Sequence, residues 1–158
     1  MFAAAAALSF ATMCAGAYVS SSNAGLACAG IPGCGGTAAF GHGSAQHVQM
    51  LHRLLATAFA IVAVVATLLA RSASARVRSF AFAACGLVAV QIALGAGNVV
   101  WRLPVGLREL HAANAGLTFV AFVVVTALAA LEPYVATAVE PHGAGRTPAA
   151  GRRVATNA

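Results

Sequence analysis

The chain has very little charge for its length, and nearly all of that charge has one sign. It contains no lysine, no aspartate and only three glutamates in 158 residues, and charged residues make up 8% of the chain. A soluble domain carries about 25% charged residues, so this sequence cannot cover a water-facing surface. Hydrophobic residues make up 61% of it. We therefore expect membrane lipid to be the solvent for most of the chain.

The nine arginines that give the net charge of +6 are not concentrated in one region of the sequence. A nucleic-acid-binding domain gathers its basic residues on one face. Here they fall in short clusters between apolar runs, which is the pattern of membrane loops. The sequence therefore predicts no nucleic acid partner.

Four apolar stretches approach the roughly 20 residues that a helix needs to cross a bilayer. They predict an all-α fold, a transmembrane four-helix bundle over residues 1–131, followed by a disordered tail at 132–158 rich in Pro, Gly and Arg. The first stretch also resembles a signal peptide, but it lacks the basic residues that begin one, which favours a retained helix. The stretches are Phe2–Val19, Met50–Ala70, Phe80–Val100 and Leu107–Leu131.

The arginines also predict the orientation of the bundle. Four spans place the connection after the second helix and the C-terminal tail on one side, and the positive-inside rule makes that side cytoplasmic. The long loop Ser20–Val48 and the turn Trp101–Gly106 are then extracytoplasmic. We expect a multi-pass protein of the cell (inner) membrane. The arginines on the cytoplasmic side are Arg71, Arg76, Arg78, Arg146, Arg152 and Arg153.

Two histidines, His52 and His111, each lie about one turn inside an apolar stretch, and both stretches enter from the outer side. An ionisable residue in a membrane is costly and usually functional, and a neutral imidazole is a common metal ligand. Two imidazoles at similar depth suit the two axial positions of haem iron. The alternative is that each histidine only hydrogen-bonds to a neighbouring helix.

Three arginines lie beside this pair, on the side where the topology rule disfavours positive charge: Arg53, Arg102 and Arg108. Guanidinium groups pair well with carboxylates. We therefore expect these arginines to bind the propionates of a haem held by the histidines.

Cys28 and Cys34 bracket a segment with Pro and Gly in the predicted outer loop. Disulfides persist in an oxidising compartment, so we expect the two to be joined. A structural staple is the favoured role, and a redox-active pair near the cofactor is the alternative. The spacing does not fit a zinc knuckle, and no second cysteine pair follows.

The third stretch carries small and polar residues that bear on packing. Gly95 and Gly97 remove side-chain bulk, so another helix or a flat ligand can approach closely. Gln91 and Asn98 are expected to form hydrogen bonds within the bundle.

Together these residues resemble the haem A synthase family, membrane enzymes that complete haem A for cytochrome oxidase. The resemblance runs in family order from about Ala15 to Phe119. Four segments carry it: Gly16-Ala17-Tyr18-Val19 leading to Gly25-Leu26-Ala27-Cys28 and Pro32-Gly33-Cys34; Met50-Leu51-His52-Arg53; Gln91-Ile92-Ala93-Leu94-Gly95-Ala96; and Leu103-Pro104 followed by His111-Ala112-Ala113-Asn114.

The resemblance implies an oxidoreductase that converts the methyl group of haem O to the formyl group of haem A. It implies His52 and His111 as axial ligands and Arg53 with Arg102 or Arg108 as propionate partners. Family members usually have two such four-helix halves, one for the haem substrate and one for a haem b cofactor. This chain resembles one half, which implies a homo-oligomer or a second half-domain, with haem O synthase as a further partner.

One departure concerns catalysis. The family's catalytic half has a glutamate three residues before its first histidine, where this chain has Gln49. An amide cannot take up a proton as a carboxylate does. Glu109 is the nearest carboxylate, and its helical position points it away from His111. The alternative is a non-catalytic protein that binds haem b in electron transfer or cytochrome oxidase assembly. A bundle without a cofactor is a third alternative.

Overall fold

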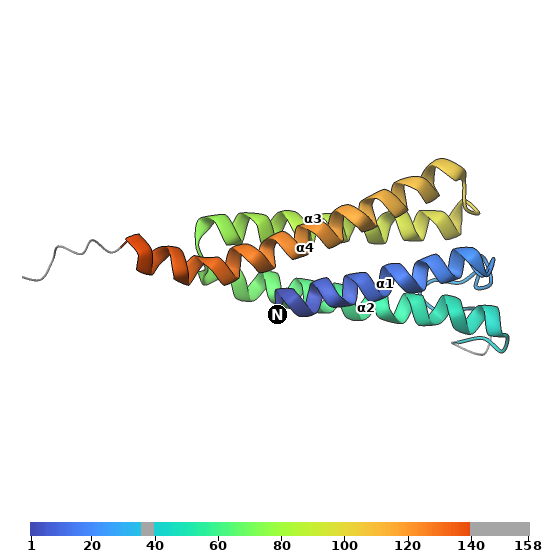
Figure 1. The fold of residues 1–158 in the computed structure, drawn as a ribbon. Helices are drawn as coiled ribbons and strands as arrows, with labels where there is room; N and C mark the ends of the chain where they lie inside the picture. The colour runs from blue at the N-terminus through green and yellow to red at the C-terminus, as the bar shows by residue number, and fades with distance from the viewer. Residues whose placement is uncertain (36–39, 140–158) are drawn as a thin grey trace, which may run out of the picture.

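The computed structural model describes residues 1–35 and 40–139, and it folds into four helices that run alternately up and down (Figure 1). Each is long and apolar enough to cross a membrane. The described residues contain no strand, so the predicted all-α, four-span fold is confirmed. The helices are α1 (Phe2–Ser21), α2 (Ser44–Leu69), α3 (Ala75–Val100) and α4 (Val105–Val139), with a short 3-10 helix, η1 (Ala70–Ser72), after α2.

The helices extend beyond the apolar stretches that predicted them. α2 begins six residues before the predicted Met50 because Gln46 Oε1 accepts a hydrogen bond from the Gly43 N–H and caps the first turn. Ser74 caps α3 in the opposite direction: it precedes the helix, and its hydroxyl oxygen accepts from the Val77 N–H at 3.3 Å. Polar caps of this kind satisfy the first N–H groups of a helix but add nothing to apolar periodicity.

The last helix runs to Val139, eight residues past the predicted boundary at Leu131. The remainder of the predicted tail, residues 140–158, lies outside the residues that the structure describes.

The four helices form a closed square. α1 packs on α2 and α4, and α3 packs on α2 and α4, so α2 and α4 occupy diagonal corners. The segments 22–35, 40–43 and 101–104 lie at one end, here called the loop end (Figure 1). They touch there, because a Cβ placed on Gly25 would stand 2.9 Å from Leu103 Cδ1.

The main hydrophobic core fills the half of the bundle away from the loop end. Phe59 of α2 and Phe122 of α4 meet across the diagonal there, edge to face, with ring centroids 5.4 Å apart. Both rings are buried, and Phe122 is 0% exposed. The outward faces of all four helices expose large apolar side chains, as lipid contact requires. The interior nearer the loop end holds the two predicted histidines.

Candidate functional site

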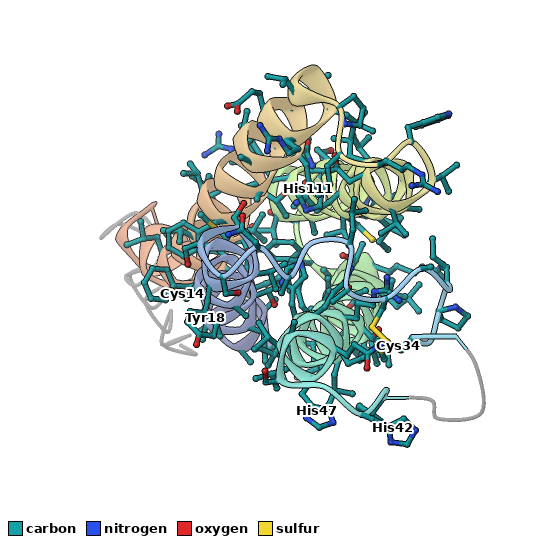
Figure 2. The ribbon with its side chains drawn as sticks, turned by 90° about the vertical axis from the view of Figure 1, so that its right-hand side faces the viewer. Cys14, Tyr18, Cys34, His42, His47 and His111 are labelled. Atoms are coloured by element: carbon teal, nitrogen blue, oxygen red, sulfur yellow. A yellow bond between two sulfur atoms is a disulfide. The ribbon has the colours of Figure 1, made fainter. Side chains whose placement is uncertain are left out.

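His52 lies on α2 and His111 on α4, at diagonal corners of the bundle. Both are partly buried. Figure 2, which looks onto the loop end, shows His111 inside the ring of helices. His52 precedes Phe59 by seven residues and His111 precedes Phe122 by eleven. That difference is about 6 Å along a helix, so the histidines lie within about one turn of the same depth.

The structure places His52 deeper in its helix than the sequence indicated. α2 starts at Ser44, so His52 is eight residues, or about two turns, inside it, whereas His111 is six residues inside α4. The other histidines of the described residues do not join them. His42 and His47 are exposed at the outer margin of the bundle (Figure 2).

The imidazole of His52 is held against α1. Its Nδ1 lies 3.1 Å from the backbone carbonyl oxygen of Thr12. A carbonyl only accepts hydrogen bonds, so Nδ1 carries the proton and Nε2 carries the lone pair. A Cβ on Gly16, four residues after Thr12, would stand 3.0 Å from Cε1 of the ring. Gly16 therefore provides the space in which the imidazole reaches the Thr12 carbonyl.

The imidazole of His111, on α4, packs against a glycine of α3 in the same way. A Cβ on Gly95 would stand 3.1 Å from Cε1 of the His111 ring, and Gly95 again lies four residues after a residue that contacts the histidine, here Gln91. The Nδ1 atom of His111 is nevertheless buried without a hydrogen-bond partner among the described residues. The two hairpins thus carry matched imidazoles that differ in one hydrogen bond. The expectation that Gly95 permits a close approach is confirmed.

A chain of amide groups accounts for that difference. Gln91 Nε2 lies 3.3 Å from Nε2 of His111 and 3.1 Å from its carbonyl oxygen. Asn114 Nδ2 donates to Gln91 Oε1 at 2.7 Å and to the carbonyl oxygen of Leu87 at 3.0 Å. Gln91 therefore forms the predicted hydrogen bonds within the bundle. Asn98 does not, since its Oδ1 is buried without a partner among the described residues.

The disulfide loop and Arg53, both predicted features of the loop end, are in contact with each other. Cys28 and Cys34 are joined, as expected. Arg53, the residue after His52, donates from one terminal nitrogen to the carbonyl oxygens of Gly30 and Gly33, at 2.6 and 2.7 Å. It also donates to the carbonyls of Pro32 and Cys28, each at 3.2 Å. Its guanidinium group is therefore bound to the disulfide loop, and the propionate role expected for it stays a prediction.

Gln49 binds the same loop through both polar atoms of its side-chain amide. Its Oε1 accepts from the Cys28 N–H at 2.6 Å, and its Nε2 donates to the Gly25 carbonyl at 2.7 Å. The side chain is 4% exposed. Only an amide can both accept and donate in this way, whereas a carboxylate only accepts. The residue that replaces the family glutamate is thus a structural tie between the loop and the helical turn before His52.

The remaining predicted residues lie on the surface of the loop end. Arg102, Arg108 and Glu109 are all exposed. Arg102 and Leu103 both have positive φ, at 56° and 60°. This backbone conformation is uncommon for such residues, and the Leu103 N–H compensates by donating to the Asn98 carbonyl at 2.7 Å. The turn directs the α3–α4 connection onto Gly25.

The donor set of the site is suited to a metal that brings most of its own ligands. A metal held by side chains alone takes three or four of them, and the described residues contain no group of three or more His, Cys, Asp or Glu that could bind one. A porphyrin supplies four nitrogens, which leaves two axial positions for imidazoles. Two inward-facing histidines and the glycines behind them fit that need.

Sequence reasoning missed Thr12 and Gly16 as parts of the site, because their contribution is a backbone carbonyl and an absent side chain. It also missed the contacts of Gln49, and it expected hydrogen bonds for Gln91 without naming His111 as a partner. A glycine four residues after a residue that contacts the histidine occurs in both hairpins, but only the tertiary structure shows that each glycine faces a histidine.

The comparisons with known proteins agree with this architecture. A family model described as a cytochrome oxidase assembly protein matches residues 1–123. This match covers all four helices down to the Phe122 contact. No curated protein and no solved structure matches the chain.

Proposed function

The chain belongs to the haem A synthase family of cytochrome oxidase assembly proteins, and we propose that it binds haem between His52 and His111 and acts in the conversion of haem O to haem A. The observation that carries the proposal is the pair of imidazoles on diagonal helices, each fitted against a glycine of the preceding helix. Burying an ionisable side chain in a membrane is costly, so such residues are usually functional. Haem ligation is a function that would account for both histidines.

The packing of the bundle supports the same site. The hydrophobic core fills the half of the bundle away from the loop end. The Phe59–Phe122 contact lies at the edge of this core that is nearer to the histidines. Arg102 and Arg108 are exposed at the loop end, where they would meet propionates that point out of the bundle. Bound haem would supply the redox chemistry, while the chain orients the imidazoles and excludes water.

The experiment that tests haem binding is an absorption spectrum of protein purified after expression with ample haem. We expect a Soret band in the wild type and its loss or a clear shift in His52→Ala and in His111→Ala. His42→Ala and His47→Ala are matched controls because both side chains are exposed, and these variants should keep the wild-type spectrum. A wild-type spectrum in all four variants overturns the ligand assignment.

Catalysis demands more than haem binding. Written as a half-reaction with water as the oxygen source, oxidation of a methyl group to a formyl group releases four protons and four electrons, and an external electron acceptor must take up the electrons. A nearby carboxylate is a plausible proton acceptor. In the part of the chain that the structure describes, the carboxylates are the exposed Glu109 at the loop end and Glu132 near the opposite end. A single copy thus offers no carboxylate beside the histidines, and a homo-oligomer or a second half-domain would have to provide one.

A second candidate function is a non-catalytic haem b protein that carries electrons or serves oxidase assembly. The Gln49 geometry favours it, because the amide is committed to the loop on both of its polar atoms. Haem extraction after co-expression with a haem O synthase separates the two functions. Haem A in the extract supports the enzyme, and haem B alone supports the non-catalytic protein.

The same family relationship bears on the location. The four apolar helices make this a multi-pass membrane protein. The inner membrane, with the loop end extracytoplasmic and the C-terminus cytoplasmic, follows from the arginine pattern as part of the proposal. Labelling of a cysteine introduced at the exposed His42 position in intact cells tests that orientation, because Cys28 and Cys34 are joined to each other.

A further inference from the structure

We propose that Gln91 is a latch on His111: its amide holds the Nε2 lone pair of that imidazole and competes for it with haem iron. His111 is then the exchangeable axial ligand and His52 the fixed one. This inference rests on the haem site proposed above and assigns a positioning role to Gln91. It follows from the direction of the hydrogen bonds around His111.

The carbonyl of Leu87 sets that direction. It can only accept, so the Asn114 group 3.0 Å from it is the NH₂ group. The same NH₂ group therefore donates to Gln91, which identifies the Gln91 atom at 2.7 Å as Oε1. The Gln91 atom that faces His111 is then the NH₂ group. Neither amide can be reversed without placing two donors or two acceptors together.

The consequence for His111 is a fixed tautomer. An NH₂ group only donates, so Nε2 of His111 accepts from Gln91 and the ring proton is on Nδ1. The lone pair on Nε2, which a ligand to iron must use, is already engaged. Among the described residues, the hydrogen bond of the His52 imidazole is made by Nδ1, to Thr12, and Nε2 is not engaged.

The unpaired Nδ1 of His111 supports the same reading. At His52 the equivalent N–H is bonded to the carbonyl of Thr12, whereas the buried Nδ1 of His111 has no hydrogen-bond partner among the described residues. A buried donor without a partner is unfavourable. The hydrogen bond from Gln91 thus holds the His111 imidazole in a position where its Nδ1 N–H lacks the carbonyl partner that the Nδ1 N–H of His52 has.

Gln91 can release the imidazole without losing all its partners. Its NH₂ group also lies 3.1 Å from the His111 carbonyl, and its Oε1 stays bonded to Asn114. The latch therefore stabilises the state in which His111 is not a ligand. A typical hydrogen bond changes an equilibrium constant by about three- to tenfold, which is the size of effect we expect.

The test uses carbon monoxide as the probe on reduced, haem-loaded full-length protein. Carbon monoxide must displace an axial histidine, and in the wild type the displaced His111 recovers its hydrogen bond to Gln91. Gln91→Leu removes that bond and should lower the apparent affinity for carbon monoxide by about three- to tenfold. Asn114→Leu, which frees Gln91 Oε1, should shift the affinity in the same direction by less, and it serves as the test if Gln91→Leu does not fold.

The matched control is Thr126→Val. It removes a side-chain hydrogen bond on the same helix as His111, the bond from Thr126 to the Phe122 carbonyl, but in the half of the bundle away from the histidines. Its affinity for carbon monoxide should equal that of the wild type. In haem-free protein with ¹⁵N-labelled histidine, Gln91→Leu should also move the imidazole nitrogen resonances of His111 and leave those of His52 in place.

The outcomes separate this inference from the function on which it rests. A protein that binds no haem overturns both. A protein that binds haem, but whose carbon monoxide affinity is unchanged or raised by Gln91→Leu, overturns the latch alone. A raised affinity would mean that Gln91 supports the ligated state of His111 instead of opposing it.

Discussion

Gly16 and His52 fit together so closely that no other residue is accommodated at position 16 without movement. A Cβ there would stand 3.0 Å from Cε1, 3.4 Å from Nδ1 and 3.8 Å from Nε2 of the imidazole. The same ring edge reaches the Thr12 carbonyl at 3.1 Å. The contact joins α1 to α2 at the level of the proposed haem, so the position of this imidazole depends on a residue that has no side chain.

Gly16→Ala should therefore displace the His52 imidazole and weaken haem binding. Added bulk in a well-packed site typically costs about 1–3 kcal/mol. We expect a smaller fraction of purified protein to retain haem, read from the ratio of Soret to protein absorbance. Gly95→Ala should act alike on His111, since its Cβ would stand 3.1 Å from that ring.

Two other glycines provide the control for this pair. A Cβ on Gly86 of α3 or on Gly116 of α4 would have nothing within 4 Å. Alanine in a helix interior is favoured over glycine by about 1 kcal/mol, so Gly86→Ala and Gly116→Ala should keep haem and unfold at an equal or higher temperature. Equal haem loss in all four variants would contradict the predicted role of Gly16 and Gly95.

Gln49→Glu should destabilise the loop end without creating haem A synthase activity. The carboxylate would keep the bond from the Cys28 N–H but would face the Gly25 carbonyl without a donor. Leaving a buried carbonyl unpaired costs about 1–3 kcal/mol, which should appear as a lower unfolding temperature. Glu109→Gln is the control, because it makes the reverse exchange at an exposed position of the loop end and should leave the unfolding temperature unchanged. Haem A production by Gln49→Glu would show that the missing carboxylate alone had prevented catalysis.

Arg53→Lys keeps the charge but removes the planar group that reaches several carbonyls at once. The loop between Cys28 and Cys34 should then open more readily, so that a water-soluble phosphine reduces the disulfide several-fold faster. Arg71→Lys, at the opposite end of the bundle, should leave the reduction rate unchanged. Two results together would contradict the loop role of Arg53. One is a wild-type rate of disulfide reduction in Arg53→Lys. The other is a loss of haem affinity in Arg53→Ala as large as in Arg108→Gln, which would mean that Arg53 binds the propionates.

Phe122→Ala should lower stability more than most single substitutions in this chain. The ring is fully buried in the main core and stacks edge to face on Phe59. Removing a buried aromatic ring typically costs about 3–5 kcal/mol. A double-mutant cycle with Phe59→Ala should give a coupling of about 0.5–1.5 kcal/mol, measured by unfolding in detergent. Additive effects of the two substitutions would mean that the rings do not interact.

The helices and the two histidines could be predicted from sequence because both signals are local. Apolar runs of spanning length gave all four helices, and a histidine inside such a run stands out by its cost. The helix ends were less accurate, since Gln46 and Ser74 extend α2 and α3 by capping, and caps leave no trace in hydropathy.

The relationships between side chains and distant backbone were beyond the sequence. Arg53 was expected to bind propionates because it follows His52, yet its guanidinium faces carbonyls more than twenty residues away in the chain. Gln49 was noted only for the proton it cannot accept, whereas the structure shows what its amide does. Contacts of this kind depend on how the loop folds back on α2, and no spacing rule encodes that path.

The edge-to-face contact of Phe59 and Phe122 also limits where the bundle can hold a flat ligand. It joins the two diagonal helices at one level, below the histidines and above most of the packed interior. The half of the bundle beyond this contact is filled by the main core, so a macrocycle would have to lie between the contact and the loop end.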